Sequence, residues 1–240
     1  DDPTTLMEFW QSALDADADL ATISRVRARP ERYTADVQIS AGYMHSGYPI
    51  MTFLDIAPVE VDLARLKGND HGGVWGLWHE MGHNHQQADW TFDGTGEVTV
   101  NLFSMYVLEK CSGITTEGHP ALNLVERARR DKAHLDAGAP FDKWKSNPFL
   151  ALDMYIQLKD AFGWDAYKQV FAEYRKLSPE ERPKTDEAKR DQWLVRFSKA
   201  VGRNLGPFFA LWGVPTSEEA RASIADLPVW IPEELADYTS

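Results

Sequence analysis

Apolar residues between positions 37 and 56 follow a short period that is typical of strands. Residues 37–39 alternate apolar and polar side chains, and residues 48–56 form an apolar, aromatic run between turn residues. Both patterns predict strands. Residues 59–63 alternate as well, but a helix is also compatible with their pattern, so this segment stays open between the two.

The rest of the chain follows a helical period. Apolar side chains recur every three or four positions behind Pro3 and again through most of the remaining chain, which predicts a series of helices. Asn147 followed by Pro148 is typical of a helix start, and Thr216 with Glu219 has the spacing of a capping box. The expected helices cover residues 6–14, 73–87, 97–110, 121–137, 148–162, 165–177, 185–201 and 218–225.

This order of elements predicts an α+β fold that is predominantly helical. A small α/β lobe would occupy residues 1–96, and a larger helical lobe would occupy residues 97–240. The length of 240 residues and the lack of a separating linker favour one domain with two lobes over two independent domains.

Composition and charge narrow the class of protein. The formal net charge is −12, so nucleic acid and anionic membrane surfaces are disfavoured as partners. No apolar run reaches about 18 residues, which excludes a membrane-spanning helix. Cys111 is the single cysteine, so no internal disulfide is expected. The chain begins with Asp-Asp-Pro and shows no signal segment, so we expect a mature domain excised from a longer protein.

The sequence WHEMGH at residues 78–83 carries the clearest chemistry. On a helix, His79 and His83 lie four positions apart and share one face, so both imidazoles can reach a single metal ion. Glu80 lies one step around the helix and can face the remaining coordination position. A zinc-bound water has a pKa near 7, and a carboxylate beside it can take its proton. The motif therefore predicts a hydrolytic zinc site.

A catalytic zinc site needs a third protein ligand and an open position. Glu97 begins the next apolar helix, after a glycine-rich turn, and we expect it to be that ligand. A carboxylate favoured by the helix dipole is the structural alternative. Asn101, one turn later, could hold His79 or His83 through the ring nitrogen that does not bind metal. A di-iron site is disfavoured, because Glu80-x-x-His83 has no second copy.

These residues resemble those of a known family. The strongest segments are GLWHEMGHNHQ at residues 76–86, Trp90, and GEVTVNL at residues 96–102; further segments lie at residues 42–51, 162–164 and 208–213. Together they resemble the enhancin-like, mucin-degrading zinc metallopeptidases (peptidase family M-sixty). The resemblance spans most of the chain, and its metal-site pairing is the specific part.

The resemblance implies a fold and a chemistry. The fold would be a zincin of the gluzincin type, with a small mixed-sheet N-terminal lobe and a helical C-terminal lobe. One Zn²⁺ would be held by His79, His83 and Glu97, and Glu80 would act as general base. The substrates would be extracellular glycoproteins, often mucins with O-glycans, cleaved by a secreted or cell-surface enzyme. Family members also carry neighbouring carbohydrate-binding domains, and we expect a monomeric catalytic domain among them.

Several further residues are weaker candidates for substrate contacts. The donor that would stabilise the oxyanion is not identified; Tyr48, Tyr155 and His85 are candidates. Trp90 lies in a polar loop between the two ligand-bearing helices and could stack on a glycan, and Arg127 could meet sugar hydroxyls or a carboxylate. Residues 46–53 could be a strand that pairs with an extended peptide. Core packing, helix ends and solvated helix faces are the structural alternatives for these residues.

Three functions follow from these observations. The first is a secreted zinc endopeptidase that acts on O-glycosylated proteins, and the second is a zinc peptidase with unglycosylated substrates. The third is a glycan-binding domain without turnover. The intact set of His79, Glu80, His83 and Glu97 argues against the third, because a domain that only binds needs no general base.

Overall fold

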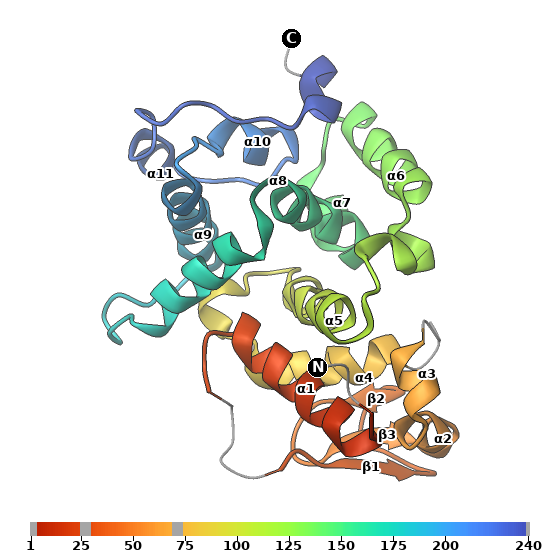
Figure 1. The fold of residues 1–240 in the computed structure, drawn as a ribbon. Helices are drawn as coiled ribbons and strands as arrows, with labels where there is room; N and C mark the ends of the chain where they lie inside the picture. The colour runs from red at the N-terminus through yellow and green to blue at the C-terminus, as the bar shows by residue number, and fades with distance from the viewer. Residues whose placement is uncertain (1–3, 25–29, 69–73, 239–240) are drawn as a thin grey trace. The chain divides into compact units, whose positions relative to one another are not determined.

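A computed structural model describes residues 4–24, 30–68 and 74–238 of the chain (Figure 1). The chain forms two compact units, Asp1–Gln86 with Val100–Asn123, and Gln87–Thr99 with Leu124–Ser240. These units differ from the lobes expected on either side of residue 96, because most of the helix that follows packs with the first unit. Within the described ranges, no helix is both long enough and apolar enough to cross a membrane.

The first unit contains a small mixed sheet with helices beside it (Figure 1). The strands have the order β1-β3-β2, with β1 parallel and β2 antiparallel to the central β3. Helix α1 packs against α4, and α4 packs against β2. The helices and strands of this unit are α1 (Leu6–Leu20), β1 (Tyr33–Asp36), β2 (Met44–His45), β3 (Ile50–Phe53), α2 (Ala57–Glu60), α3 (Leu63–Lys67), α4 (Val74–His85) and, from Val100 onward, α5 (Gly96–Ser112).

The strand positions correct the expectation for residues 37–39. The strand β1 ends at Asp36, and Val37 is 73% exposed, so its apolar side chain does not belong to a buried strand face. The expected strand at residues 48–56 narrows to β3, in which Ile50 and Thr52 are fully buried. The segment left open at residues 59–63 forms the helices α2 and α3, and Asp62 caps the second of them.

The core of the first unit lies between α1, the sheet and α4. Its fully buried members include Phe9 of α1, Ile50 of β3, and Leu77 and Trp78 of α4. Helix α1 begins with a capping box in which the Thr5 side chain accepts the Glu8 amide hydrogen. Because Leu77 and Trp78 are part of this core, the apolar face of α4 is fixed there, and the other face of α4 is available for polar side chains.

The second unit is helical, which confirms the predominantly helical α+β class. The long helix α8 contacts α6, α7 and α9. It joins the two helices expected at residues 148–162 and 165–177, with a bend at Gly163, where φ is 75°. The helices of this unit are α6 (Leu124–Asp136), α7 (Phe141–Lys145), α8 (Pro148–Arg175), α9 (Asp186–Val201), α10 (Gly206–Leu211) and α11 (Glu218–Ala222).

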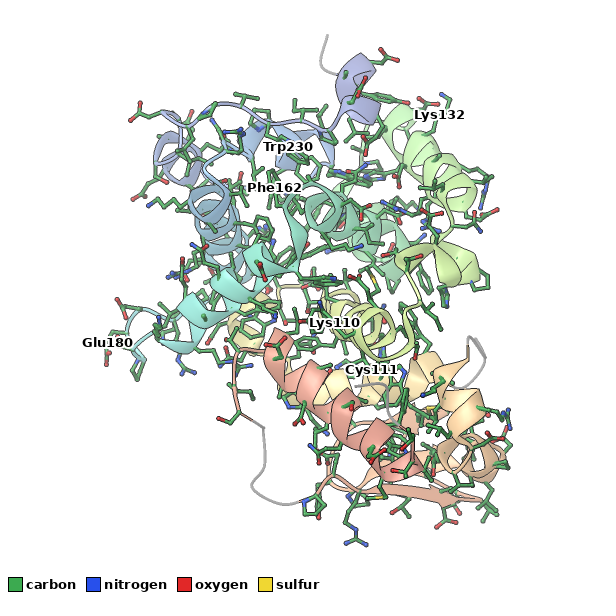
Figure 2. All side chains as sticks on the ribbon, in the orientation of Figure 1. Lys110, Cys111, Lys132, Phe162, Glu180 and Trp230 are labelled. Atoms are coloured by element: carbon green, nitrogen blue, oxygen red, sulfur yellow. The ribbon has the colours of Figure 1, made fainter. Side chains whose placement is uncertain are left out.

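The helix ends of the second unit follow the sequence in one case and depart from it in another. Asn147 caps α8 by accepting the Leu150 amide hydrogen at 3.2 Å, as the Asn-Pro pair predicts. The cap of α11 is Ser217 rather than Thr216, because the Ser217 hydroxyl accepts the Ala220 amide hydrogen. The core of this unit is aromatic and includes Phe171 and Trp193. Figure 2 shows the half-buried Phe162 beside Trp230, and their ring centroids lie 4.8 Å apart.

A buried cluster of charged side chains joins α6 to α8. The guanidinium of Arg130 donates to both carboxylate oxygens of Asp153, at 2.7 and 2.8 Å, and Asp153 is fully buried. Asp131 lies beside Asp153 and is 8% exposed. Burial, together with the negative charge of Asp153, raises the pKa of Asp131 to about 9. Asp131 is therefore protonated at neutral pH. Burial raises the pKa of Asp153 as well, and Arg130 and the hydrogen bond with Asp131 oppose that rise.

This pKa predicts a pH dependence of stability. Below the ordinary Asp value of 3.8 both the folded and the unfolded chain hold the Asp131 proton, and above it only the folded chain does, up to about pH 9. The contribution of Asp131 to the free energy of unfolding is therefore lost as pH rises, by up to about 1.4 kcal/mol per pH unit. We expect Asp131→Asn, which stays neutral, to flatten this fall, measured by urea unfolding at several pH values between about 5 and 9.

Asp136→Asn is the control for this experiment, because Asp136 lies on the same helix but is exposed and paired with Lys132. We expect its stability to keep the pH slope of the wild type. An Asp131→Asn variant with an unchanged slope would contradict the assignment of the buried proton.

Candidate metal centre and active site

The two histidines of the HExxH motif lie on the same face of α4. The ring centroids of His79 and His83 are 4.7 Å apart, and the ring planes are nearly perpendicular, at 88°. Both side chains are half-buried, as is that of Glu80. On the other face of the helix, Leu77 and Met81 are buried in the core, which fixes the rotation of the helix about its own axis. The apolar pattern of α4 thus determines where its imidazoles point.

Helix α5 supplies the third candidate ligand. Glu97 lies in the first turn of α5 and is exposed, and Asn101 lies one turn later and is 4% exposed. Because α5 is one continuous helix, its geometry sets the position of Glu97 relative to Asn101. One ligand atom from each of His79, His83 and Glu97 lies within 4.8 Å of the other two. These three side chains could therefore hold one metal ion.

Two amide oxygens orient the imidazoles. The Nδ1–H of His79 donates to the Oδ1 of Asn101 at 2.7 Å, and the Nδ1–H of His83 donates to the Oε1 of Gln86 at 3.0 Å. With its hydrogen on Nδ1, each neutral ring carries the lone pair on Nε2, the nitrogen that would bind a metal. Two neutral imidazoles and one carboxylate are a donor set that suits a catalytic zinc site with an open fourth position. The side chains present therefore fit the ion.

Sequence reasoning missed Gln86. A signal was available, because Gln86 follows His83 by three positions and residues so spaced are neighbours on a helix surface. It lies just beyond the last residue of α4, where the chain still follows the helix: the Gln86 amide donates to the Gly82 carbonyl at 2.8 Å. The same rule applies to Asn101, which lies four positions after Glu97.

The helices α4 and α5 approach closely at Gly82. A Cβ atom on Gly82 would lie 2.8 Å from the Phe103 Cβ and 3.1 Å from the Val100 Cγ2, both on α5. Such distances are shorter than van der Waals contact, so only glycine fits here without movement of α5. This close approach brings Asn101 within hydrogen-bonding distance of His79.

A reciprocal pair of hydrogen bonds joins the segment before β3 to α4. The Gly47 amide donates to the Oδ1 of Asn84 at 3.2 Å, and the Nδ2 of Asn84 donates to the Gly47 carbonyl at 3.1 Å.

The strand β3 lies in the centre of the sheet and has partners on both sides, whereas β2 is an edge strand. The prediction that residues 46–53 offer a free strand edge is therefore wrong for β3, since its backbone already pairs twice.

The weaker candidates in the first unit occupy two different environments. Tyr48 is half-buried, and the guanidinium of Arg32 lies 5.9 Å from its ring centroid. His85 is 1% exposed and forms an ion-pair contact with Asp17 of α1, which is also buried. The position of His85 inside the core corrects the expectation that it contacts substrate. Tyr48 remains a predicted oxyanion donor.

The weaker candidates in the second unit are buried among its own side chains. Trp90 has no exposed surface and packs on Phe171, with ring centroids 4.4 Å apart, so its ring faces are not available for a sugar. Tyr155 is 2% exposed and lies in the same aromatic core, beside Trp193. Arg127 is 8% exposed and pairs with the carboxylates of Asp153 and Asp160. In this structure, packing and charge pairing account for all three.

Comparison with known proteins identifies the family. Residues 1–213 match the family described as Peptidase M60, enhancin and enhancin-like. The chain belongs to this family. The match confirms the resemblance stated from the motifs on α4 and α5, and it extends over both units.

Curated relatives are considerably longer than the chain. TRPM8 channel-associated factor 2 of Homo sapiens is 45% identical over 239 residues, which cover 99% of this chain and 25% of that protein. The protein of the same description from Bos taurus is 44% identical over 240 residues. The chain spans about a quarter of the length of these relatives.

Solved structures share the fold. A conserved protein of unknown function from Bacillus anthracis str. Ames matches with a TM-score of 0.79 and 29% identity, over 95% of this chain and 47% of that one. The structure of IMPa from Pseudomonas aeruginosa in complex with an O-glycopeptide matches with a TM-score of 0.66 and 17% identity, over 93% of this chain and 32% of that one. At this low identity the second match shows the fold alone.

The contact at Gly82 gives a testable prediction. We expect Gly82→Ala to lower the free energy of unfolding by a net amount of up to about 2 kcal/mol, because overpacking costs about 1–3 kcal/mol and the better helix propensity of Ala offsets about 1 kcal/mol. Displacement of α5 would also weaken the binding of divalent metal. Urea unfolding and competition with a metal-binding dye measure the two effects.

Gly76→Ala on the same helix is the matched control. Its Cβ would meet only the Sδ and Cε atoms of Met44, at 2.8 and 3.0 Å, and this flexible side chain can rotate away. We expect near-normal stability and metal binding for this variant. Equal losses in both variants would show that the approach of α5 is not what matters at Gly82.

Proposed function

We propose that this domain is a zinc-dependent endopeptidase that hydrolyses peptide bonds of O-glycosylated proteins. The observation that carries the proposal is the convergence of His79, His83 and Glu97, with each imidazole turned so that Nε2 would bind the metal. We assign these three side chains as the zinc ligands. Membership of the peptidase M60 family supports the same assignment.

The remaining chemistry falls to Glu80. When bound, the zinc ion would polarise the scissile carbonyl and lower the pKa of a bound water. Glu80 is next to His79 on α4 and half-buried, so it can take the proton of the attacking water and then deliver it to the leaving amine. Asn101 and Gln86 keep the imidazoles in the required tautomer during this cycle. Tyr48 stays a candidate for stabilising the oxyanion.

Glycoproteins are the proposed substrates. The solved structure of IMPa, which has the same fold, contains an O-glycopeptide, and this supports a glycopeptide as the substrate class here. Extracellular mucin-type proteins are rich in such segments, so we propose a secreted or cell-surface enzyme. The greater length of the curated relatives supports further domains in the full protein, and we expect these to include carbohydrate-binding modules.

A function without turnover is the second candidate. The curated relatives at 44–45% identity are described as TRPM8 channel-associated factors, a description that names an association and no hydrolysis. In such a function the domain would recognise a glycan or protein surface, and Glu80 would have no chemical role. A peptidase with unglycosylated substrates is the remaining alternative.

Substitution of the two glutamates separates catalysis from metal binding. We expect Glu80→Gln to bind zinc with near-normal affinity and to lose about 10²–10⁴-fold in kcat, because only the proton acceptor is removed. Glu97→Gln should weaken zinc binding and lose activity with it, because a ligand is removed. Zinc affinity by dye competition and peptidase rates measure both properties. Normal turnover in Glu80→Gln would rule out the assignment of the base.

A substrate panel distinguishes the three functions. The protein is incubated with mucin, enzymatically deglycosylated mucin and casein, each with and without a metal chelator. We expect cleavage of mucin alone, lost on chelation and restored by added zinc. Cleavage of casein would favour the peptidase with unglycosylated substrates. Binding to mucin without any cleavage would favour the domain without turnover.

A further inference from the structure

Two hydrogen-bond donors share the side-chain oxygen of Asn101. The Nδ1–H of His79 donates to Oδ1 at 2.7 Å, and the indole Nε1–H of Trp75 donates to the same atom at 3.1 Å. Trp75 lies on α4, four positions before His79, and both residues belong to the first unit together with Asn101. The two side chains on α4 thus meet one amide group on α5.

The indole donor determines which end of the amide faces α4. An indole N–H can only donate, whereas a primary amide presents an acceptor at one end and donors at the other. If the amide of Asn101 turned by 180°, its NH₂ group would face the indole N–H, and two donors would be left without an acceptor. Donors without an acceptor destabilise this orientation of the amide. Trp75 therefore keeps the oxygen of Asn101 directed at α4.

The orientation of this amide controls the proton on His79. An amide oxygen accepts from Nδ1–H, which leaves the lone pair on Nε2. A turned amide would donate to Nδ1 instead, and the neutral ring would then carry its hydrogen on Nε2. That tautomer cannot ligate a metal through Nε2 without first losing the hydrogen bond. The indole of Trp75 thus biases the ring towards the tautomer that binds.

We propose that Trp75 is a positioning residue that fixes the metal-binding tautomer of His79 by way of the Asn101 amide. This inference rests on the proposed zinc site. It assigns to Trp75 an effect on metal affinity that acts through the Asn101 amide. The relevant atom is the indole nitrogen, because it donates to the same oxygen as His79.

The ring of Trp75 is itself held in place. It packs on the imidazole of His119, with ring centroids 4.5 Å apart and an interplanar angle of 47°. The Nδ1 of His119 in turn accepts the Ala121 amide hydrogen at 3.2 Å, which anchors that imidazole to the backbone. The indole therefore has little freedom to turn its N–H away from Asn101.

Trp75→Phe is the direct test, because it keeps an aromatic ring on His119 and removes the N–H. We expect about a tenfold weaker zinc affinity, measured by competition with a chromophoric chelator near neutral pH, since partners of metal-binding histidines contribute about 10–100-fold. Trp10→Phe is the matched control. Trp10 also donates its indole N–H at 3.0 Å in the same unit, but to the backbone carbonyl of Glu60, so its loss should leave zinc affinity unchanged.

The same substitution in an Asn101→Asp variant distinguishes an effect on the His79 tautomer from an effect on the packing of α4. In Asn101→Asp the carboxylate offers an oxygen to His79 in either orientation, so no indole is needed to select one. We expect Trp75→Phe to have no further effect on zinc affinity in this background. If Trp75→Phe acted by disturbing the packing of α4, the loss would be of the same size with Asn or Asp at this position, and the inference would be overturned.

The outcomes also distinguish this inference from the proposed function. Normal zinc affinity in Trp75→Phe, with the wild type binding zinc, would overturn the role of Trp75 and leave the peptidase proposal intact. A wild-type chain that binds no zinc would overturn both. Thermal unfolding of each variant, compared with Trp10→Phe, checks that the fold is kept. A selective loss in Trp75→Phe that Asn101→Asp removes supports the inference.

Discussion

Helices α4 and α5 meet at Gly82, where α4 presents no side chain to Val100 and Phe103 of α5, and the geometry of the metal centre depends on this contact. The ring nitrogens on α4 reach the amide on α5 only because the helix axes are closer than a Cβ atom would permit. Burial of Leu77 and Met81, on the face of α4 away from the imidazoles, fixes the rotation of this helix about its own axis. The packing of α4 against α5 thus determines where the His79 imidazole and the Asn101 amide lie. The motif HExxH specifies which side chains are present, and the glycine within it allows the partner helix to approach.

The residues that orient the imidazoles are neutral amides, and this has an electrostatic consequence. Asn101 and Gln86 accept hydrogen bonds without adding charge, so Glu97 contributes the one negative charge of the proposed ligand set. A bound dication would retain a net positive charge, which is what a Lewis acid needs in order to act on a carbonyl. An amide, unlike a carboxylate, has an acceptor at one end and donors at the other, so a further group must fix its orientation. Carboxylates in the same positions would not need such a group.

The parts of the site that sequence could predict are those set by local helix geometry. The pairing of His79 with His83, and of Asn101 with Glu97, follows from spacings of four along a helix, and such spacings hold whatever the tertiary structure. Glu97 itself was predicted from its place at the start of the next helix. The small α/β lobe and the helical remainder also followed from patterning, and the mixed sheet from the family resemblance. The first strand was placed too late, because the exposed Val37 and the half-buried Ile39 were taken for a strand face. Strand β2, of two residues, is too short to leave a pattern.

Contacts between distant segments could not be predicted, because local sequence patterns carry no information about them. Trp75 meets Asn101 across 26 positions, and nothing in either residue's neighbourhood indicates the pairing. Trp90 lies in a polar loop by sequence, yet its ring enters the aromatic core of the second unit. Exposure inferred from local polarity fails where a loop folds back onto its own unit, and residues of this kind are located only by the tertiary structure.

The buried contact between Asp17 and His85 extends the metal centre's dependence to the first helix of the chain. His85 lies two positions beyond His83, and its partner comes from α1. Burial raises the pKa of Asp17. Removal of either side chain would leave a buried polar group without its partner, at a cost of about 1–3 kcal/mol. Although α1 contributes no candidate ligand, it belongs to the minimal functional unit. For protein engineering, a shortened version must therefore keep α1 with its buried Phe9 and Asp17, and cannot begin at the HExxH helix.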